Sequence, residues 1–154
     1  MKTFPNSRTR HREKGGAAVE MAIVLPILIM LVTTLVFFAR VFWYYSVMQK
    51  AAQDATRFLS TATQVEMRTT GAPMAAVARS IVEAETSLLR STGDDFAIDV
   101  QCNFATCGFA VPVTVRTVIQ MRMSDDIFGP FTSAFYGSDG LVLTADVTMR
   151  YAGN

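Results

Sequence analysis

The sequence of 154 residues contains a single histidine, His11, and only two cysteines, Cys102 and Cys107. His11 lies in a basic N-terminal segment, so the rest of the chain has no histidine for a Ser-His-Asp hydrolase site. Neither a phosphate-binding P-loop nor a dinucleotide-binding glycine motif occurs. Two thiols without further ligands do not make a zinc site. We therefore expect no enzyme activity and no cofactor.

Acidic clusters and basic patches are also scarce. The pairs Asp125-Asp126 and Ser138-Asp139 lack the regular acid spacing of a calcium-binding EF-hand loop, so we expect no metal site. The net charge is +1, but residues 1–14 carry five basic residues against one acid, an excess of four. The remainder therefore sums to −3 (+1 minus +4), a mildly acidic body in which nothing suggests binding to nucleic acid.

One long run has no charge at all, from Met21 to Ala39. At ~1.5 Å per residue, this run with its flanking residues spans a hydrocarbon core of roughly 30 Å, and we predict a transmembrane helix over residues 16–40. The basic leader, residues 1–15, is then cytoplasmic, and residues 41–154 form an exported domain. A secretory signal peptide is the competing interpretation. The run is too long for it, and it continues into Arg40 and an aromatic cluster typical of a membrane interface.

The helical pattern continues beyond the predicted membrane span. Apolar residues recur at steps of four and three, at Tyr44, Met48, Ala51, Ala55, Phe58, Ala62 and Val65. This spacing predicts one continuous helix of some fifty residues with a narrow apolar stripe, and Pro26 should bend its membrane part. The stripe can pack against the chain's own sheet, form a filament contact, or do both.

The C-terminal half changes its period. Gly71-Ala72-Pro73 breaks the long helix, and a second helix follows with an apolar face, ending near Ser91-Thr92-Gly93. That face consists of Met74, Val77, Ile81, Ala84 and Leu88. Alternating patterns then predict three strands, starting at Phe96, Phe109 and Leu141, with a long loop from Ser124 to Gly140. Helices followed by strands favour an α+β fold, with a small antiparallel sheet laid on the exported half of the long helix.

The two cysteines lie in the predicted exported part, within the segment that connects the first two strands. In an oxidising compartment, Cys102 and Cys107 would form a disulfide across a short loop. Two free thiols in the core are the alternative.

The segment Gly15-Gly16-Ala17-Ala18-Val19-Glu20 places glycine after basic residues and a glutamate five positions into an apolar helix. A carboxylate near bilayer depth costs a few kcal/mol or more, so an anchor alone does not explain Glu20. The pattern resembles a type IV prepilin leader, which a prepilin peptidase would cut between Gly15 and Gly16. Gly16 would become the first residue, and Glu20 could pair with the new α-ammonium group of its own or a neighbouring chain.

The whole chain is similar to the TadE-like pseudopilins of tight-adherence (Flp-type) pilus systems, whose TadF- and TadG-type relatives share the same opening. The segment "GGAAVEMAIVLPILIMLV" carries the resemblance, together with "VMQKAAQDATRFLSTA" and the closing strand "LVLTADVTMRYAG". The sequence departs from the family pattern at Met21, because the residue after the glutamate is often aromatic in these proteins.

This resemblance implies a minor pilin or pseudopilin, pilin-like in fold, that is anchored in the inner membrane and acts in pilus assembly and adhesion. Its partners would be other pilins, the inner-membrane platform, the peptidase and membrane lipid. An uncleaved single-pass protein with a ligand-binding periplasmic domain is the alternative, and it would need neither Gly15 nor Glu20.

Overall fold

The computed structural model describes residues 16–69, 71, 73–90, 96–108, 110–123 and 140–153. The chain divides after Ala39 into two units. Helix α1, Gly16–Thr61, is 46 residues long and contributes to both units. It continues through Pro26, although the proline ring removes the N–H that would bond to the Ala22 carbonyl.

In the first unit, α1 exposes most of its large apolar side chains, with the exception of Phe37, which is 5% exposed. Met21 and Ile23 are 65% and 63% exposed, and most large apolar residues between them and Phe38 are similar. The hydroxyl of Thr34 donates to the Met30 carbonyl, so this polar side chain is satisfied within the helix. Burying a large apolar side chain is worth about 1.5–3 kcal/mol, so this surface requires lipid or other helices as its surroundings.

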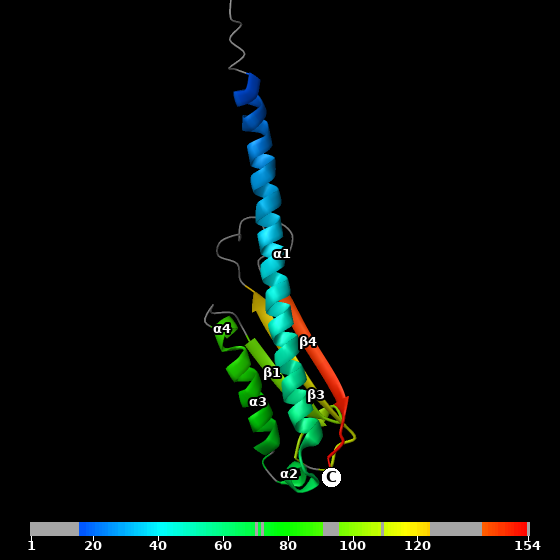
Figure 1. Ribbon diagram of the computed structural model, residues 1–154. Helices are drawn as coiled ribbons and strands as arrows, with labels where there is room; N and C mark the ends of the chain where they lie inside the picture. Colours follow the sequence, from blue (N-terminus) through cyan, green and yellow to red (C-terminus); the bar gives the residue numbers. More distant parts are fainter. Residues whose placement is uncertain are drawn as a thin grey trace, which may run out of the picture. The chain divides into compact units, whose positions relative to one another are not determined.

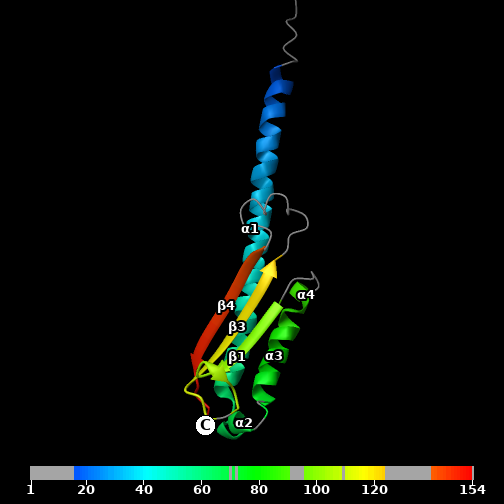
Figure 2. The same ribbon diagram turned by 180° about the vertical axis from the view of Figure 1, so that it is seen from behind.

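The second unit has two layers, helices on one face of a sheet (Figures 1 and 2). Its helical layer consists of the C-terminal part of α1, α2 at Gln64–Arg68, α3 at Pro73–Glu85 and α4 at Ser87–Arg90. The strands are β1 at Phe96–Cys102, β2 at Ala105–Thr106, β3 at Thr114–Met123 and β4 at Leu141–Arg150. All pairs are antiparallel, in the order β2-β1-β3-β4. The predicted α+β class is confirmed.

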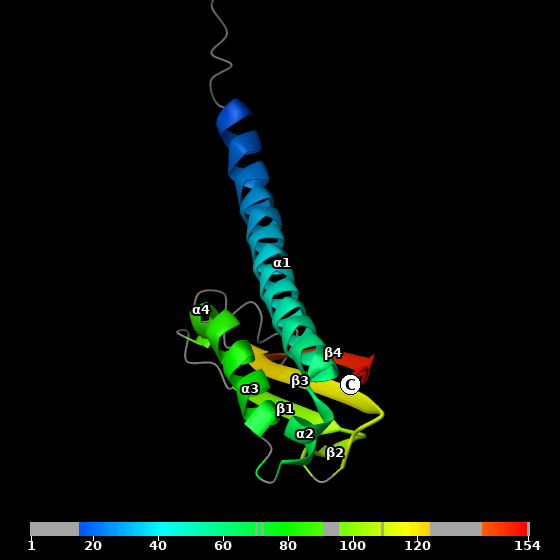
Figure 3. The ribbon, with the colours of Figure 1, turned by 60° about the horizontal axis from the view of Figure 1, so that its bottom comes forward.

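The core lies between α1 and the sheet (Figure 3). The predicted apolar stripe of α1 is buried from Tyr44 through Met48 to Ala62, with Phe58 half-buried. Ala51, Ala52 and Ala55 are fully buried, as is the Thr56 side chain, whose hydroxyl donates to the Ala52 carbonyl at 2.6 Å. The same hydroxyl lies 3.4 Å from the Val147 carbonyl oxygen of β4, which is a direct contact between α1 and the sheet.

The predicted end of the long helix is wrong. Helix α1 stops at Thr61, and α2 begins two residues later behind an N-cap at Thr63. The Thr63 side chain accepts from the Glu66 N–H, while the Glu66 carboxylate accepts from the Thr63 N–H at 2.9 Å. The hydrogen bond that the Thr63 hydroxyl donates to the Glu66 carboxylate, and then the one from the Thr63 N–H, lower the pKa of Glu66. The chain therefore changes direction before Val65, which is 78% exposed rather than part of the stripe.

The predicted face of the second helix is also wrong in part. Pro73 is the first residue of α3, as the helix break predicted, but the helix ends at Glu85 and a turn at Thr86 precedes α4. The buried residues are Ala78, Val82 and Leu89. Val77, Ala84 and Leu88, predicted to face the core, are exposed. The turn at Thr86 rotates α4, so the 3–4 spacing does not carry across it to Leu88. Within α3 itself, the buried side contains Ala78 and Val82 rather than Val77 and Ala84.

The sheet has four strands rather than three. β1 and β4 begin at the predicted residues, Phe96 and Leu141, but β3 begins at Thr114 and not at Phe109. Pro112 lacks an N–H and precedes the ladder, and Val113 is 64% exposed. The additional strand, β2, pairs with the end of β1. The predicted helix end at residues 91–93, Phe109 and almost all of the predicted 124–140 loop lie outside the described residues.

The end of the chain is tied to the end of α1. The Tyr151 hydroxyl donates to the Ala62 carbonyl at 2.6 Å, and the Ala152 N–H donates to the Ser60 carbonyl at 2.9 Å. A Cβ at Gly153 would collide with the Ala62 carbonyl oxygen and the Tyr151 hydroxyl. These contacts satisfy carbonyls of the last turn of α1 that have no intrahelical donor.

Replacing Leu89 with alanine should lower the free energy of unfolding by about 2–5 kcal/mol, since Leu89 is 1% exposed and its removal leaves a cavity. The matched control is Leu88→Ala next to it, where the side chain is 75% exposed and the expected change is within about 0.5 kcal/mol. Chemical denaturation of the full chain in detergent measures both. Equal effects would contradict the described orientation of α4.

Candidate functional site

The first turns of α1 contain the residues predicted to act in processing and assembly. Gly16 is the first helical residue and is exposed, and a Cβ built on it would have no atom within 4 Å. Packing within the chain therefore gives no reason for glycine at this position. Gly15, on the other side of the predicted cleavage site, lies outside the described residues.

Glu20 stands one helical turn beyond Gly16, on the same side of the helix. Its side chain is exposed, and it forms no hydrogen bond or ion pair with any residue that the structure describes. Around it lie only exposed apolar side chains such as Val19, Met21 and Ile23. A carboxylate surrounded in this way requires a cation from elsewhere if the helix enters a membrane.

Aromatic residues follow Arg40 on α1. Phe42, Trp43 and Tyr45 are exposed by 67%, 51% and 41%. The Arg40 guanidinium donates to the hydroxyl of buried Tyr44 at 3.0 and 3.1 Å and lies 5.3 Å from its ring centre. An arginine and exposed aromatic rings at the end of an apolar helix are typical of a membrane interface. Together with the one long apolar helix near the N-terminus, they indicate single-pass membrane anchoring.

The two cysteines lie together in the structure, in a geometry that allows a disulfide. Cys102 and Cys107 form a disulfide, and both residues are buried. The bond closes the hairpin of β1 and β2, in which Asn103 and Phe104 have φ of 51° and 63°. Both values are those of a two-residue type I′ turn, which suits asparagine better than phenylalanine. The disulfide thus restrains a turn that places Phe104, 67% exposed, at its tip.

An arginine connects this hairpin tip to the open face of the sheet. Arg116 on β3 makes a bidentate ion pair with Asp146 on β4, and its Nε lies 2.8 Å from Asp146 Oδ1. Its guanidinium is 5.6 Å from the centre of the Phe104 ring. The hydrogen bonds to Arg116 lower the pKa of Asp146 against a smaller opposing effect of burial, and they raise the pKa of Arg116.

A second charged group lies between α1 and α3. Lys50 Nζ is 3.8 Å from both Asp54 and Glu85 carboxylate oxygens. Partial burial, and then the charge of Asp54, raise the pKa of Glu85, and the charge of Lys50 opposes them. The Lys50 side chain is 72% exposed, so these ion pairs are weak and link the helices without making a site.

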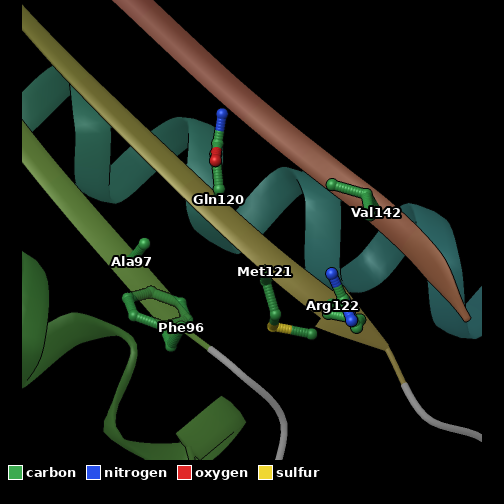
Figure 4. A pocket seen from close by; sticks show the side chains of 6 residues that line it. All are labelled: Phe96, Ala97, Gln120, Met121, Arg122 and Val142. Atoms are coloured by element: carbon green, nitrogen blue, oxygen red, sulfur yellow. The ribbon is translucent and has the colours of Figure 1, made fainter. Parts of the chain in front are cut away.

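A pocket of about 280 Å³ opens where β1 begins and β3 ends (Figure 4). Its lining consists of Phe96, Ala97, Gln120, Met121, Arg122 and Val142. Arg122 and Gln120 are its only polar side chains, so it holds no acid–base pair for catalysis. It contains none of the residues predicted as functional.

Among the described residues, no group of three or more His, Cys, Asp or Glu could hold a metal ion. The pairs Asp125-Asp126 and Ser138-Asp139 lie outside the described residues. The structure thus brings together the two cysteines and places Gly16 and Glu20 on one turn. The Arg116–Asp146 pair was not predicted. Its signal in the sequence is a pair of opposite charges at polar positions of two alternating strands, which turn out to be neighbours.

A family model described as TadE-like protein matches residues 15–57. The match includes the glycine pair, Glu20, the apolar run and most of the buried stripe of α1, and it confirms the resemblance for this segment. It leaves α2, α3, α4 and the sheet outside. The family is associated with Tad pilus systems as a structural component. No curated protein and no solved structure matches the chain.

The carboxyl of Asp146 should titrate below the ordinary value of about 3.9, because the charged form is the one that Arg116 binds. The pair therefore stabilises the fold above the unfolded-state pKa, and its contribution is lost as the pH falls through the lowered pKa. NMR titration should show the midpoint rising in Arg116→Gln. Arg122→Gln, on the same strand but without contact to Asp146, should leave it unchanged. A midpoint insensitive to Arg116→Gln would contradict the ion pair.

Proposed function

We propose that this chain is a minor pilin or pseudopilin of a tight-adherence (Flp, type IVc) pilus system. Prepilin peptidase would cut it between Gly15 and Gly16, and the mature chain would act in pilus assembly and surface adhesion. The observation that carries this proposal is Glu20, an exposed carboxylate without a described partner on an apolar helix inside the TadE-like segment.

The geometry of the first helical turn supports cleavage before Gly16. Glycine here has no packing role in the chain, but its lack of a Cβ lets the backbone reach a peptidase site in an extended form. After cleavage, the new α-ammonium group would lie one turn from Glu20. Because a charged pair in hydrocarbon is far less costly than either charge alone, Glu20 would pair with the α-ammonium of its own or a neighbouring chain.

The two units support a division of roles. The exposed apolar surface of residues 19–38 would lie in the inner membrane, with the basic leader in the cytoplasm, and could then contact the helices of other pilins. The second unit buries its own stripe of α1 against the sheet, so that part of the helix is not available for filament contacts. The sheet domain would be exported, with the inner-membrane platform and the peptidase as further partners.

The protein recovered from membranes should begin at Gly16, and it should keep residues 1–15 when prepilin peptidase is absent. Intact mass and the N-terminal residue, measured in both backgrounds, test this. Gly15→Leu should block cutting, whereas Ala18→Leu, inside the helix, should not. A chain that keeps its leader in both backgrounds would instead support the uncleaved single-pass protein with a periplasmic binding domain.

Replacing Glu20 with glutamine should leave cutting largely intact but impair pilus assembly, since it removes the charge and keeps the size of the side chain. Thr34→Val is a matched control, because the Thr34 hydroxyl is already satisfied within the helix. Surface pili and the processed protein in membranes are counted for both variants. Normal piliation with Glu20→Gln would remove the assembly role of this carboxylate.

A further inference from the structure

The sheet ends in one open edge. β4 is the last strand in the order β2-β1-β3-β4 and pairs with β3 only. In Figures 1 and 2 it forms the outer border of the sheet in both views. The opposite border is β2, a strand of two residues in a disulfide-closed hairpin. The β2 border therefore offers only two residues for pairing, whereas the β4 border is a full strand of ten residues.

The hydrogen-bond pattern shows which backbone groups face outward. The Tyr151 N–H donates to the Val113 carbonyl, so odd-numbered residues of β4 face β3. Because the direction alternates along a strand, the backbone groups of even-numbered residues face away from the sheet. These residues are Val142, Thr144, Asp146, Thr148 and Arg150. None of the residues that the structure describes bonds to their backbone N–H or C=O groups.

This edge lacks the devices that usually prevent pairing. The strand contains no proline, glycine or lysine, and its ten pairs with β3 run one-to-one from Met123–Leu141 to Thr114–Arg150 without a bulge. Six of its ten residues are valine, threonine or leucine, which suits a ladder on both sides. Of its two charges, Asp146 is held by Arg116. A strand of this kind is a template for another extended chain.

The side chains beside the edge define the chemistry of that chain. On the face covered by α1, Val147 and Met149 are only half-buried although their neighbours Leu143 and Ala145 are buried. On the open face, Arg150 is exposed and no described residue pairs with it. An added strand would cover Val147 and Met149 with apolar side chains on the first face, and it would place a carboxylate beside Arg150 on the second face.

A second copy of this chain does not fit the edge well. In an antiparallel pair of two β4 strands, the only carboxylate of the second strand that Arg150 could meet is Asp146, which Arg116 already holds. In a parallel pair, an outward-facing residue lies opposite an inward-facing one. Both copies have outward-facing even residues, so they would have to shift by one residue and could not form a two-fold pair.

We propose that the open edge of β4 binds one extended strand of a different polypeptide, with apolar side chains against Val147 and Met149 and a carboxylate beside Arg150. The proposal requires neither cleavage at Gly16 nor the pairing of Glu20, so it can stand or fall independently of the proposed function.

The first test is amide hydrogen exchange, measured by NMR on the full chain in detergent micelles. Even-numbered amides of β4 should exchange fast and odd-numbered ones slowly. Slow exchange of both sets at low protein concentration would overturn the proposal, because the edge would already be covered. Protection that increases with protein concentration would also overturn it, by showing that a second copy occupies the edge.

The second test adds a synthetic peptide of about ten residues that alternates valine and threonine and carries one glutamate to face Arg150. Binding should saturate and slow the even-numbered amides. A peptide with lysine in place of glutamate should bind roughly three- to tenfold more weakly, and one N-methylated on its edge-facing amides should not bind.

Charge reversal identifies the position of the contact. Arg150→Glu should reverse the preference, so that the lysine peptide binds more tightly. Arg122→Glu is the matched control, because Arg122 lies on the same face of the sheet near the other end of β4 and should leave the preference unchanged. Absence of binding by either peptide, or equal binding of both by the native chain, would overturn the proposal.

Discussion

The close packing of α1 on the sheet is the constraint on which the rest of the structure depends. Ala51, Ala52 and Ala55 are fully buried in the core that α1 shares with the sheet, and the Thr56 hydroxyl lies 3.4 Å from the Val147 carbonyl oxygen of β4. Larger residues at Met48 and Leu59 then fill the space on either side. The same helix continues without interruption into the apolar first unit. The C-terminal part of α1 therefore belongs to a packed protein core, whereas its N-terminal part has an exposed apolar surface.

That dual use explains where polar groups occur. The C-terminal end of α1 is closed by hydrogen bonds from Tyr151 and Ala152 to the carbonyls of Ala62 and Ser60. The start of α2 is closed by the Thr63–Glu66 capping box. Charges lie at the border of the helical layer or on the open face of the sheet, where water screens them. One buried hydroxyl, Thr117 Oγ1, has no partner among the described residues, and burying such a group without one costs free energy. The exception in the first unit is Glu20, and this is why it carries the functional proposal.

Local pattern was sufficient for much of the fold. The 3–4 spacing from Tyr44 to Ala62 and the alternation in β1 and β4 predicted the buried faces, because each element lies against a single partner surface. The pattern failed where the chain turned within a run of apolar residues. Val65 and Leu88 kept the spacing, but the cap at Thr63 and the turn at Thr86 rotated them into solvent. Pro112, which has no N–H to donate, likewise delays the start of β3 to Thr114.

The sequence by itself determined the apolar span, its unusual Glu20 after two glycines, and the separation of a helical half from a strand half, since these depend only on residue type and period. Tertiary structure decided the strand order, the pairing of Arg116 with Asp146 and the open edge of β4. These depend on which strands become neighbours and in which register, and alternation is the same for every neighbour. The alternating sequence pattern of a strand is the same in the middle of a sheet and at its border. Only the assembled sheet therefore shows which backbone N–H and C=O groups have no partner strand.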